Sequence, residues 1–142
     1  MHSDYTLRQV SWQQAEDKLR LLREQIFIKE QLVPEELEWD GLDDSCIHIL
    51  VEDKHGNPVA TARLLDNGHI GRMGVLSEHR HHGIGTAMLQ YLTELCWQHQ
   101  WQAHLSAQTH ALGFYQQLGF IVNSEEYLDA NIPHKDMILE AT

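Results

Sequence analysis

Residues 69–98 read HIGRMGVLSEHRHHGIGTAMLQYLTELCWQ, and this stretch decides the fold of the chain. Its first eight residues, 69–76, are typical of a short strand, and the two internal glycines indicate a bulge or a close backbone approach. From Ile84 onward apolar residues recur at helical spacing, which predicts a helix that ends near Gln98. The turn Arg80–Gly85 between them exposes backbone N–H groups at a helix start, an arrangement that suits a phosphate.

The residues of this turn alone do not identify which phosphate-containing ligand binds there. A dinucleotide-binding fingerprint needs a third glycine, but that place holds Met88. A mononucleotide loop needs a lysine after its second glycine, and none follows Gly85. A glycine-rich turn without any ligand is an equally good interpretation of these six residues alone.

On the N-terminal side the chain predicts a strand, a helix and an acidic segment. Residues 5–10 alternate as a strand does, and Ser11 with Gln14 forms a capping box for a helix that Pro34 stops. Six of the eleven residues in 34–44 are acidic. That segment is either a solvated loop or short helix, or else the wall of a site for an amine.

The remaining segments complete a mixed sheet. Two turns separate three strands that form an antiparallel meander, and the helix then crosses over to a parallel strand. The strands expected here are 45–51, 58–65, 69–76, 101–106, 120–122 and 136–139. A short helix begins at Thr109 and ends at Gly119, and an irregular connection through 131–134 precedes the last strand. We expect one α/β domain over residues 1–142.

Composition excludes several classes of protein. The formal net charge of −11 disfavours a nucleic-acid surface but leaves cationic substrates open. No apolar run approaches the roughly 20 residues of a membrane span, and no export signal is visible. Cys46 and Cys96 have no metal or redox spacing and are expected in the core of a cytoplasmic protein. His79, His81 and His82 lack the further ligands of a zinc site, so we expect no metal.

A second sequence motif makes the interpretation of the glycine turn more specific. Phe114-Tyr115-Gln116-Gln117-Leu118-Gly119-Phe120 follows about thirty residues after Arg80-His81-His82-Gly83-Ile84-Gly85. Together these motifs resemble the GNAT acetyltransferase superfamily across essentially the whole chain, and residues 24–40 and 126–134 are similar to its bacterial ElaA/YjcF-like subgroup. The resemblance implies a single-domain GNAT-like fold, with a mostly antiparallel sheet of six to seven strands flanked by about four helices.

The resemblance also implies a reaction and a co-substrate site. Acetyl-CoA would donate its acetyl group to a primary amine, with a small-molecule acceptor favoured. Backbone N–H groups at 81–86 would bind the diphosphate, Arg80 and Arg72 would add positive charge, and the pantetheine arm would pair with the backbone beside a bulge at Gly74. The co-substrate residues implied are Met73, Gly74, Val75, Arg80, His81, His82, Gly83, Ile84, Gly85, Thr86 and Phe114.

The catalytic candidates follow from the needs of that reaction. Tyr115 is the candidate general acid for the departing thiolate, the alternative being an aromatic that only packs the helix. The acceptor ammonium must lose a proton before it attacks. We consider bulk water and five side chains as the base, His134 having the most suitable intrinsic pKa. These side chains are Glu30, Glu38, Asp40, Glu126 and His134.

Two other functions are compatible with the same residues. One is a module that binds acyl-CoA without turnover, and the other is a lysine acetyltransferase acting on a protein partner. Helix 16–32 and the last strand are also candidate surfaces for a homodimer.

Overall fold

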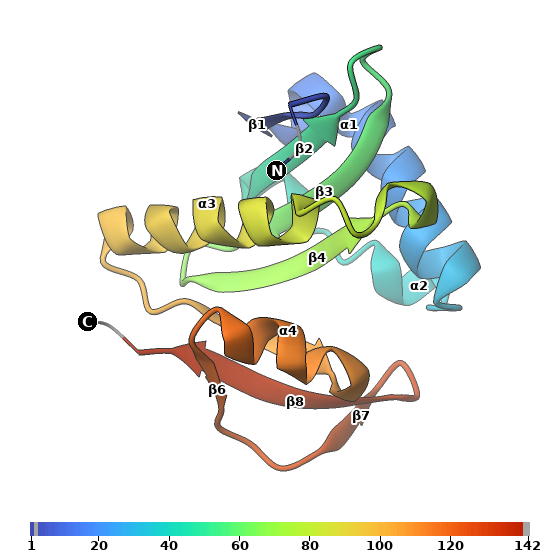
Figure 1. Ribbon diagram of the computed structural model, residues 1–142. Helices are drawn as coiled ribbons and strands as arrows, with labels where there is room; N and C mark the ends of the chain where they lie inside the picture. The colour runs from blue at the N-terminus through green and yellow to red at the C-terminus, as the bar shows by residue number, and fades with distance from the viewer. Residues whose placement is uncertain (2, 141–142) are drawn as a thin grey trace.

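An eight-stranded mixed sheet runs through the middle of the described chain (Figure 1). The structure is a computed structural model that describes residues 1 and 3–140. The strand order is β1-β2-β3-β4-β5-β8-β6, and β7 pairs with β8 beside β6. The strands are β1 (Thr6–Val10), β2 (Ile47–Glu52), β3 (Pro58–Leu64), β4 (His69–Val75), β5 (His104–Gln108), β6 (Phe120–Val122), β7 (Tyr127–Asp129) and β8 (Ile132–Leu139).

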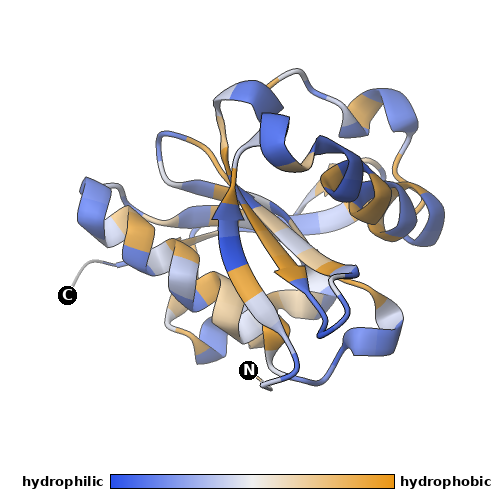
Figure 2. Cartoon of the chain, turned by 90° about the horizontal axis from the view of Figure 1, so that it is seen from above, coloured by the Kyte–Doolittle hydropathy of each residue, from blue (hydrophilic) through white to orange (hydrophobic). Residues whose placement is uncertain are grey.

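Helices lie on both sides of this sheet, as the view from above shows (Figure 2). The α-helices of the described residues are α1 (Trp12–Arg23), α2 (Glu35–Glu38), α3 (Ile84–His99) and α4 (Leu112–Gln117). The π-helix η1 (Glu24–Glu30) continues α1, and the 3₁₀ turns are η2 (Asp43–Ser45), η3 (Ser77–His79) and η4 (Thr109–Ala111). The predicted capping box is present, since Ser11 and Gln14 exchange hydrogen bonds between side chain and backbone. The α/β fold class predicted from the sequence is confirmed.

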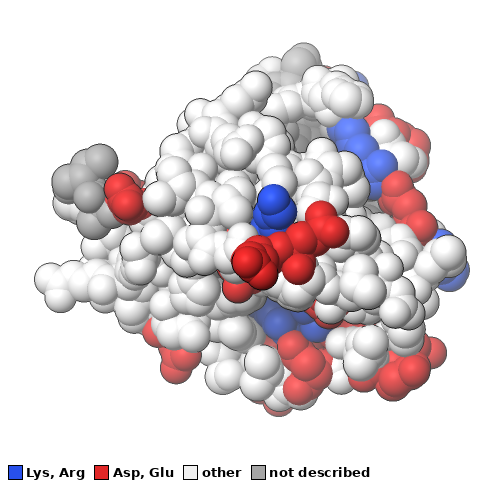
Figure 3. Space-filling model, turned by 90° about the horizontal axis from the view of Figure 1, so that it is seen from below, with Lys and Arg blue, Asp and Glu red and all other residues white. Residues whose placement is uncertain are grey.

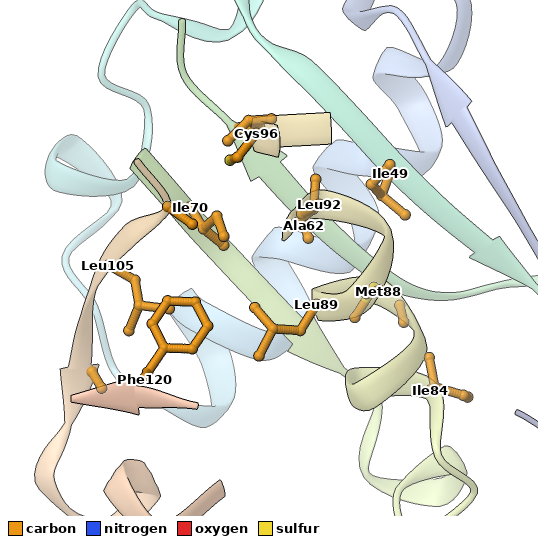
Figure 4. Close-up of a cluster of buried hydrophobic side chains, with 14 of the residues drawn as sticks. Ile49, Ala62, Ile70, Ile84, Met88, Leu89, Leu92, Cys96, Leu105 and Phe120 are labelled. Carbon is orange, nitrogen blue, oxygen red and sulfur yellow. The ribbon is translucent and has the colours of Figure 1, made fainter. Parts of the chain in front are cut away.

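Two hydrophobic cores hold the layers together. In the larger core α3 packs Met88, Leu89 and Leu92 onto the central strands, and Phe120 joins it from β6 (Figure 4). In the smaller core Leu19 and other side chains of α1 and η1 cover the opposite face of the sheet. Because their apolar faces are almost completely buried, both helical layers are fixed to β2–β4.

The parallel strands β4 and β5 pair over a short distance and then diverge. Their register contains only His69 opposite His104 and Ile70 opposite Leu105. Further along β4, the Leu76 N–H donates to the carbonyl of Val59 over 2.9 Å, which makes Val75 and Ala60 a non-hydrogen-bonded pair. The N–H and C=O of Val75 therefore point away from β3, toward the gap that β5 leaves.

A bulge in β4 lies one position before the predicted one. The pairing of Thr61 with Gly74 and of Arg63 with Gly71 puts the extra residue at Arg72 and Met73, and Arg72 has φ of +48°. Gly74 itself meets a packing requirement, because a Cβ there would lie 2.8 Å from Cγ2 of Ile26 in η1.

Several predicted boundaries were wrong. The expected strand 101–106 begins at His104, and the helix expected from Thr109 starts as the 3₁₀ turn η4. The last strand is twice the predicted length, so His134 lies on β8 rather than in an irregular connection. The three-residue strand β7 was not predicted, and it raises the strand number from the expected six or seven to eight.

Candidate active site

A cavity of about 460 Å³ fills the gap between the diverging strands. Its walls come from η1, α2, β4, β5, η4, α4 and the β7–β8 hairpin. Of the residues predicted for the site it brings together Glu38, Met73, Tyr115 and His134. The other predicted co-substrate residues, including the whole turn 80–86, are not among its lining residues.

The glycine turn has the geometry of an anion site next to this cavity. His81 and Gly83 both have positive φ, at +68° and +80°, and Gly83 is the residue before the first turn of α3. No side chain caps the helix, and its first turn contains no acidic residue. The first N–H groups of α3 therefore keep their capacity to donate to an anion.

The Arg80 side chain takes a different direction from the expected one. Its guanidinium forms a two-bonded ion pair with Glu30 at 2.6 and 2.8 Å, and its Nε donates to the carbonyl of Val75 over 3.0 Å. The hydrogen bond from Arg80 lowers the pKa of Glu30, which keeps that carboxylate charged. Arg80 therefore ties η1 to the glycine turn, and its positive charge is already offset.

Phe114 and Tyr115 lie on consecutive positions of α4 and differ in role. A Cβ on Gly85 would lie 3.4 Å from the Phe114 ring, an ordinary van der Waals distance, so this ring lies directly beside the start of α3. Tyr115 lines the cavity, and its ring meets those of Phe114 and Phe120 edge-on. Burial raises the pKa of Tyr115 to about 12, and no residue in the described chain forms a hydrogen bond with its hydroxyl.

His134 is held in one orientation on the floor of the cavity. Its Nδ1 lies 2.7 Å from the carbonyl of Ile132, and the ring of Tyr127 on the neighbouring strand stacks against it. Because a carbonyl only accepts, Nδ1 carries the hydrogen, and Nε2 of the neutral ring keeps its lone pair. Tyr127 is fixed in turn by its hydroxyl, which donates to Asp136.

Glu38 is occupied by two arginines. Its carboxylate accepts from Nε of Arg23 over 2.7 Å and lies 3.0 Å from Nε of Arg72, with 2% of the residue exposed. Because two guanidinium groups already engage this carboxylate, it has less capacity to bind an acceptor ammonium, which argues against Glu38 as the base.

Asp40 and Asp43, in the same acidic segment as Glu38, also accept hydrogen bonds from arginine side chains. Asp43 bonds Arg23 and Arg63, and hydrogen bonds from Arg63 overcome burial and lower the pKa of Asp40 to about 2. The segment thus contains a short helix, α2, as one of the two interpretations expected, and Glu35, Glu36 and Asp44 are exposed. The other three carboxylates, of Glu38, Asp40 and Asp43, form one half of a partly buried ion-pair network.

Three polar residues of the cavity were missed by the sequence analysis. The Gln108 amide donates to Gln31 over 2.9 Å, and its oxygen lies 2.6 Å from Nε2 of His110. These hydrogen bonds connect Gln31, the residue after η1, to the end of β5 and to η4. The alternation of His104, Ser106 and Gln108 along β5 was a signal that could have found one of them.

No metal centre is found in residues 1 and 3–140, where no three His, Cys, Asp or Glu side chains converge. His79 instead lies 2.8 Å from the hydroxyl of Tyr5, and the Tyr5 ring also contacts His82. Among the helices of the described chain, none combines the length and apolar character that a membrane-spanning segment needs.

The profile of the family described as "Acetyltransferase (GNAT) domain" matches residues 3–141. The chain belongs to the GNAT acetyltransferase family. It is 39% identical over 122 residues to the protein named "Uncharacterized N-acetyltransferase YjcF" of Bacillus subtilis, covering 82% of this chain and 86% of that one. The GNAT assignment makes the protein an acyl-CoA-dependent N-acyltransferase, and acetyl-CoA is the co-substrate that the family uses.

Two solved structures agree with the GNAT assignment. The crystal structure of Escherichia coli ElaA superposes with a TM-score of 0.83 at 31% identity, covering 95% of this chain and 99% of that one. An acyl-CoA N-acyltransferase from Pseudomonas aeruginosa superposes with a TM-score of 0.80 at 30% identity, covering 96% and 99%. The likeness to the ElaA/YjcF subgroup expected from residues 24–40 and 126–134 is confirmed.

Proposed function

We propose that this GNAT protein transfers an acetyl group from acetyl-CoA to the primary amine of a small molecule. One observation carries the proposal: Tyr115 and His134 line the same cavity, at the point where β4 and β5 separate. One side chain can donate a hydrogen bond to a leaving group, and the other can accept a proton.

The co-substrate would occupy the gap and the glycine turn. The N–H groups of residues 81–86, at a helix start with two positive-φ positions, suit the diphosphate. The N–H of Val75, which points away from β3, suits a carbonyl of the pantetheine arm, while the Val75 carbonyl already accepts from Arg80. A backbone N–H of the β4 bulge would then donate a hydrogen bond to the thioester oxygen as negative charge develops on that oxygen.

In the chemical step the amine nitrogen attacks the thioester carbon, and the C–S bond breaks as the C–N bond forms. The departing thiolate takes the negative charge, and the Tyr115 hydroxyl donates a hydrogen bond to it. The nitrogen, positively charged after the attack, releases its second proton as the amide forms, and the thiolate takes up one proton to give the thiol. The pKa of about 12 keeps the phenol protonated, but it exceeds the value of about 8.5 for an ordinary thiol. Tyr115 therefore stabilises the thiolate as a donor, and complete proton transfer is uphill.

His134 is the best-supported base. The acceptor arrives as an ammonium and has no lone pair until it loses a proton. Nε2 of His134 can take that proton directly or through one water, because Nδ1 is committed to the carbonyl of Ile132. Glu38 is the weaker candidate, since Arg23 and Arg72 already hold its carboxylate.

A matched pair of glycine variants tests the co-substrate site. Gly83→Asp introduces a side chain and a negative charge where we place the diphosphate. The control, Gly56→Asp, introduces the same side chain and charge in the β2–β3 hairpin turn, where the φ of +81° is close to the +80° of Gly83. Calorimetry should detect acetyl-CoA binding in the wild type and in Gly56→Asp but not in Gly83→Asp. Equal binding by both variants would remove the basis for the diphosphate site.

Turnover is tested by thioester consumption with a library of primary amines and a set of basic peptides. We expect small amines to be acetylated in preference to peptides. Acetylation of peptides alone would identify a lysine acetyltransferase, and binding of acetyl-CoA without consumption by any acceptor would identify a non-catalytic module.

A further inference from the structure

A second cavity adjoins the one that contains Tyr115 and His134. It measures about 190 Å³, and it shares His69, Leu105 and Ser106 with the larger cavity. Its floor is the face of β5 and β8 opposite α4, on which His104, Ser106 and Asp136 lie. The two spaces have three residues in common, and His134 of the larger one and Asp136 of the smaller one lie on the same face of β8, so the cavities are neighbours along that face.

Asp136 is the one carboxylate among the residues that line the smaller cavity, and no lysine or arginine lines it. Its Oδ1 accepts from the hydroxyls of Ser106 and Tyr127, at 2.9 and 2.5 Å. Within residues 1 and 3–140 no donor contacts Oδ2. The carboxylate is thus oriented by two hydroxyls and keeps one oxygen for a further donor.

The charges around both cavities favour a cation over an anion. Arg72 is the one arginine that lines the larger cavity, and its guanidinium lies 3.0 Å from Glu38 and 3.3 Å from Asp40. Burial lowers the pKa of His69, so this ring stays neutral at neutral pH and does not offset Asp136. His104, the other imidazole there, contacts His69 edge-on and binds the carbonyl of Gln102 through Nδ1. On the face seen from below, basic side chains also adjoin acidic ones (Figure 3).

We infer that the acceptor is a short diamine, or an amine with a second ammonium group, whose distal cation binds Asp136 in the smaller cavity. This inference rests on the proposed function and specifies its substrate class. His134 and Asp136 lie two residues apart on one face of β8, a separation of about 7 Å. A four-carbon diamine, with five single bonds of about 1.5 Å each in zigzag, is close to that length.

Three probes of equal chain length test the inference: diaminobutane, butylamine and aminobutyrate. The kcat/KM of the wild type should be about tenfold higher for diaminobutane than for butylamine, and lowest for aminobutyrate, whose carboxylate would meet Asp136. Asp136→Asn should bring the first ratio close to one, mainly through a higher KM for diaminobutane. Asp129→Asn removes a carboxylate of the larger cavity and should keep the ratio. Equal rates for both amines, or an equal loss of the ratio in both variants, would overturn the inference.

A binding measurement separates this inference from the proposed function and needs no variant to fold. Calorimetry on the wild type saturated with CoA should give about tenfold tighter binding of diaminobutane than of butylamine. Equal affinities, or no binding of either amine, would overturn the diamine inference even if another amine is acetylated. Tighter binding of diaminobutane without thioester consumption would support the second cavity while contradicting the enzymatic proposal.

Discussion

Burial of the Tyr115 hydroxyl has two opposite consequences for catalysis. It keeps the phenol protonated, yet a pKa of about 12 makes full proton donation to a thiolate costly. We therefore predict that Tyr115→Phe lowers kcat by about 100-fold, the lower end of the range for acid–base assistance. The Kd for acetyl-CoA should stay within about twofold, because the ring contacts with Phe114 and Phe120 survive.

Tyr91→Phe on the exposed side of α3 is the matched control for Tyr115→Phe, since it removes a hydroxyl far from the cavity lining. Its kcat should equal that of the wild type. If Tyr115→Phe also retains the full kcat with a good acceptor, the aromatic has only a packing role.

His134 gives a second prediction, concerning the pH dependence of the reaction. A general base must be unprotonated to accept a proton, so a reaction that depends on one has an acid limb, along which kcat/KM falls as the pH falls. His134→Gln should lower kcat/KM by about 100-fold at neutral pH and flatten this acid limb of the profile. A pH series of initial rates on both proteins checks it, with His55→Gln, in the β2–β3 turn, as the control. An unchanged acid limb in His134→Gln would assign it to another group.

The residues predicted from the sequence were those whose chemistry depends on local spacing. Gly83 and Tyr115 stand in motifs; Gly83 has positive φ before α3 and Tyr115 lines the cavity, and their roles in binding and catalysis stay predictions. Glu38 shows the limit of that approach, because no spacing along the chain reveals that Arg23 and Arg72 converge on it. Partners of this kind are set by how α1 and β4 pack, which is a property of the folded chain.

At the scale of elements, the contact between η1 and β4 determines one wall of the cavity. A Cβ at position 74 would lie 2.8 Å from Cγ2 of Ile26 and 3.2 Å from the ring of Phe27. Gly74→Ala should therefore lower the free energy of unfolding by about 1–3 kcal/mol through overpacking. Urea denaturation measures this change.

Gly113→Ala is the counterpart of Gly74→Ala, because nothing lies within 4 Å of a Cβ on this residue of α4. Alanine there should be neutral or stabilise the protein by up to about 1 kcal/mol, as expected for glycine in a helix. If both substitutions give the same change, direct packing of η1 on β4 is not the reason for a glycine at position 74.

The elements that the sequence predicted well are the long ones with a regular pattern. β2, β3 and α3 were found within two residues of their ends, because alternation or helical spacing is sustained over several turns or pairs. β7 has only three residues, all exposed, and Pro133 obscures the first half of β8. Pairing with β8, rather than local pattern, makes both segments strands.

At the scale of the whole molecule, the excess of negative charge coexists with a partly buried network of paired charges. The formal net charge is −11, yet Arg23, Arg63 and Arg72 meet Glu38, Asp40 and Asp43 between α1, α2 and the sheet. Taking one partner from such a network leaves an uncompensated charge, which costs more than the pair contributes. The network therefore fixes how the α2 segment sits on the sheet more than it adds to overall stability.

His48 couples the same region to pH and gives the last prediction. It is 1% exposed, its ring packs on Trp12, and its Nε2 lies 2.9 Å from the carbonyl of Asp43. Burial lowers the pKa of His48 in the folded state, so between that value and about 6.5 the unfolded chain binds more protons. Stability should be complete above about pH 6.5 and decline as the pH falls below it. We propose to measure the urea midpoint of unfolding from neutral to mildly acidic pH. The midpoint should fall less in His48→Gln than in the wild type or in the control His55→Gln, which changes an exposed histidine. If the midpoints of all three proteins fall in parallel, His48 is not the cause of the pH dependence.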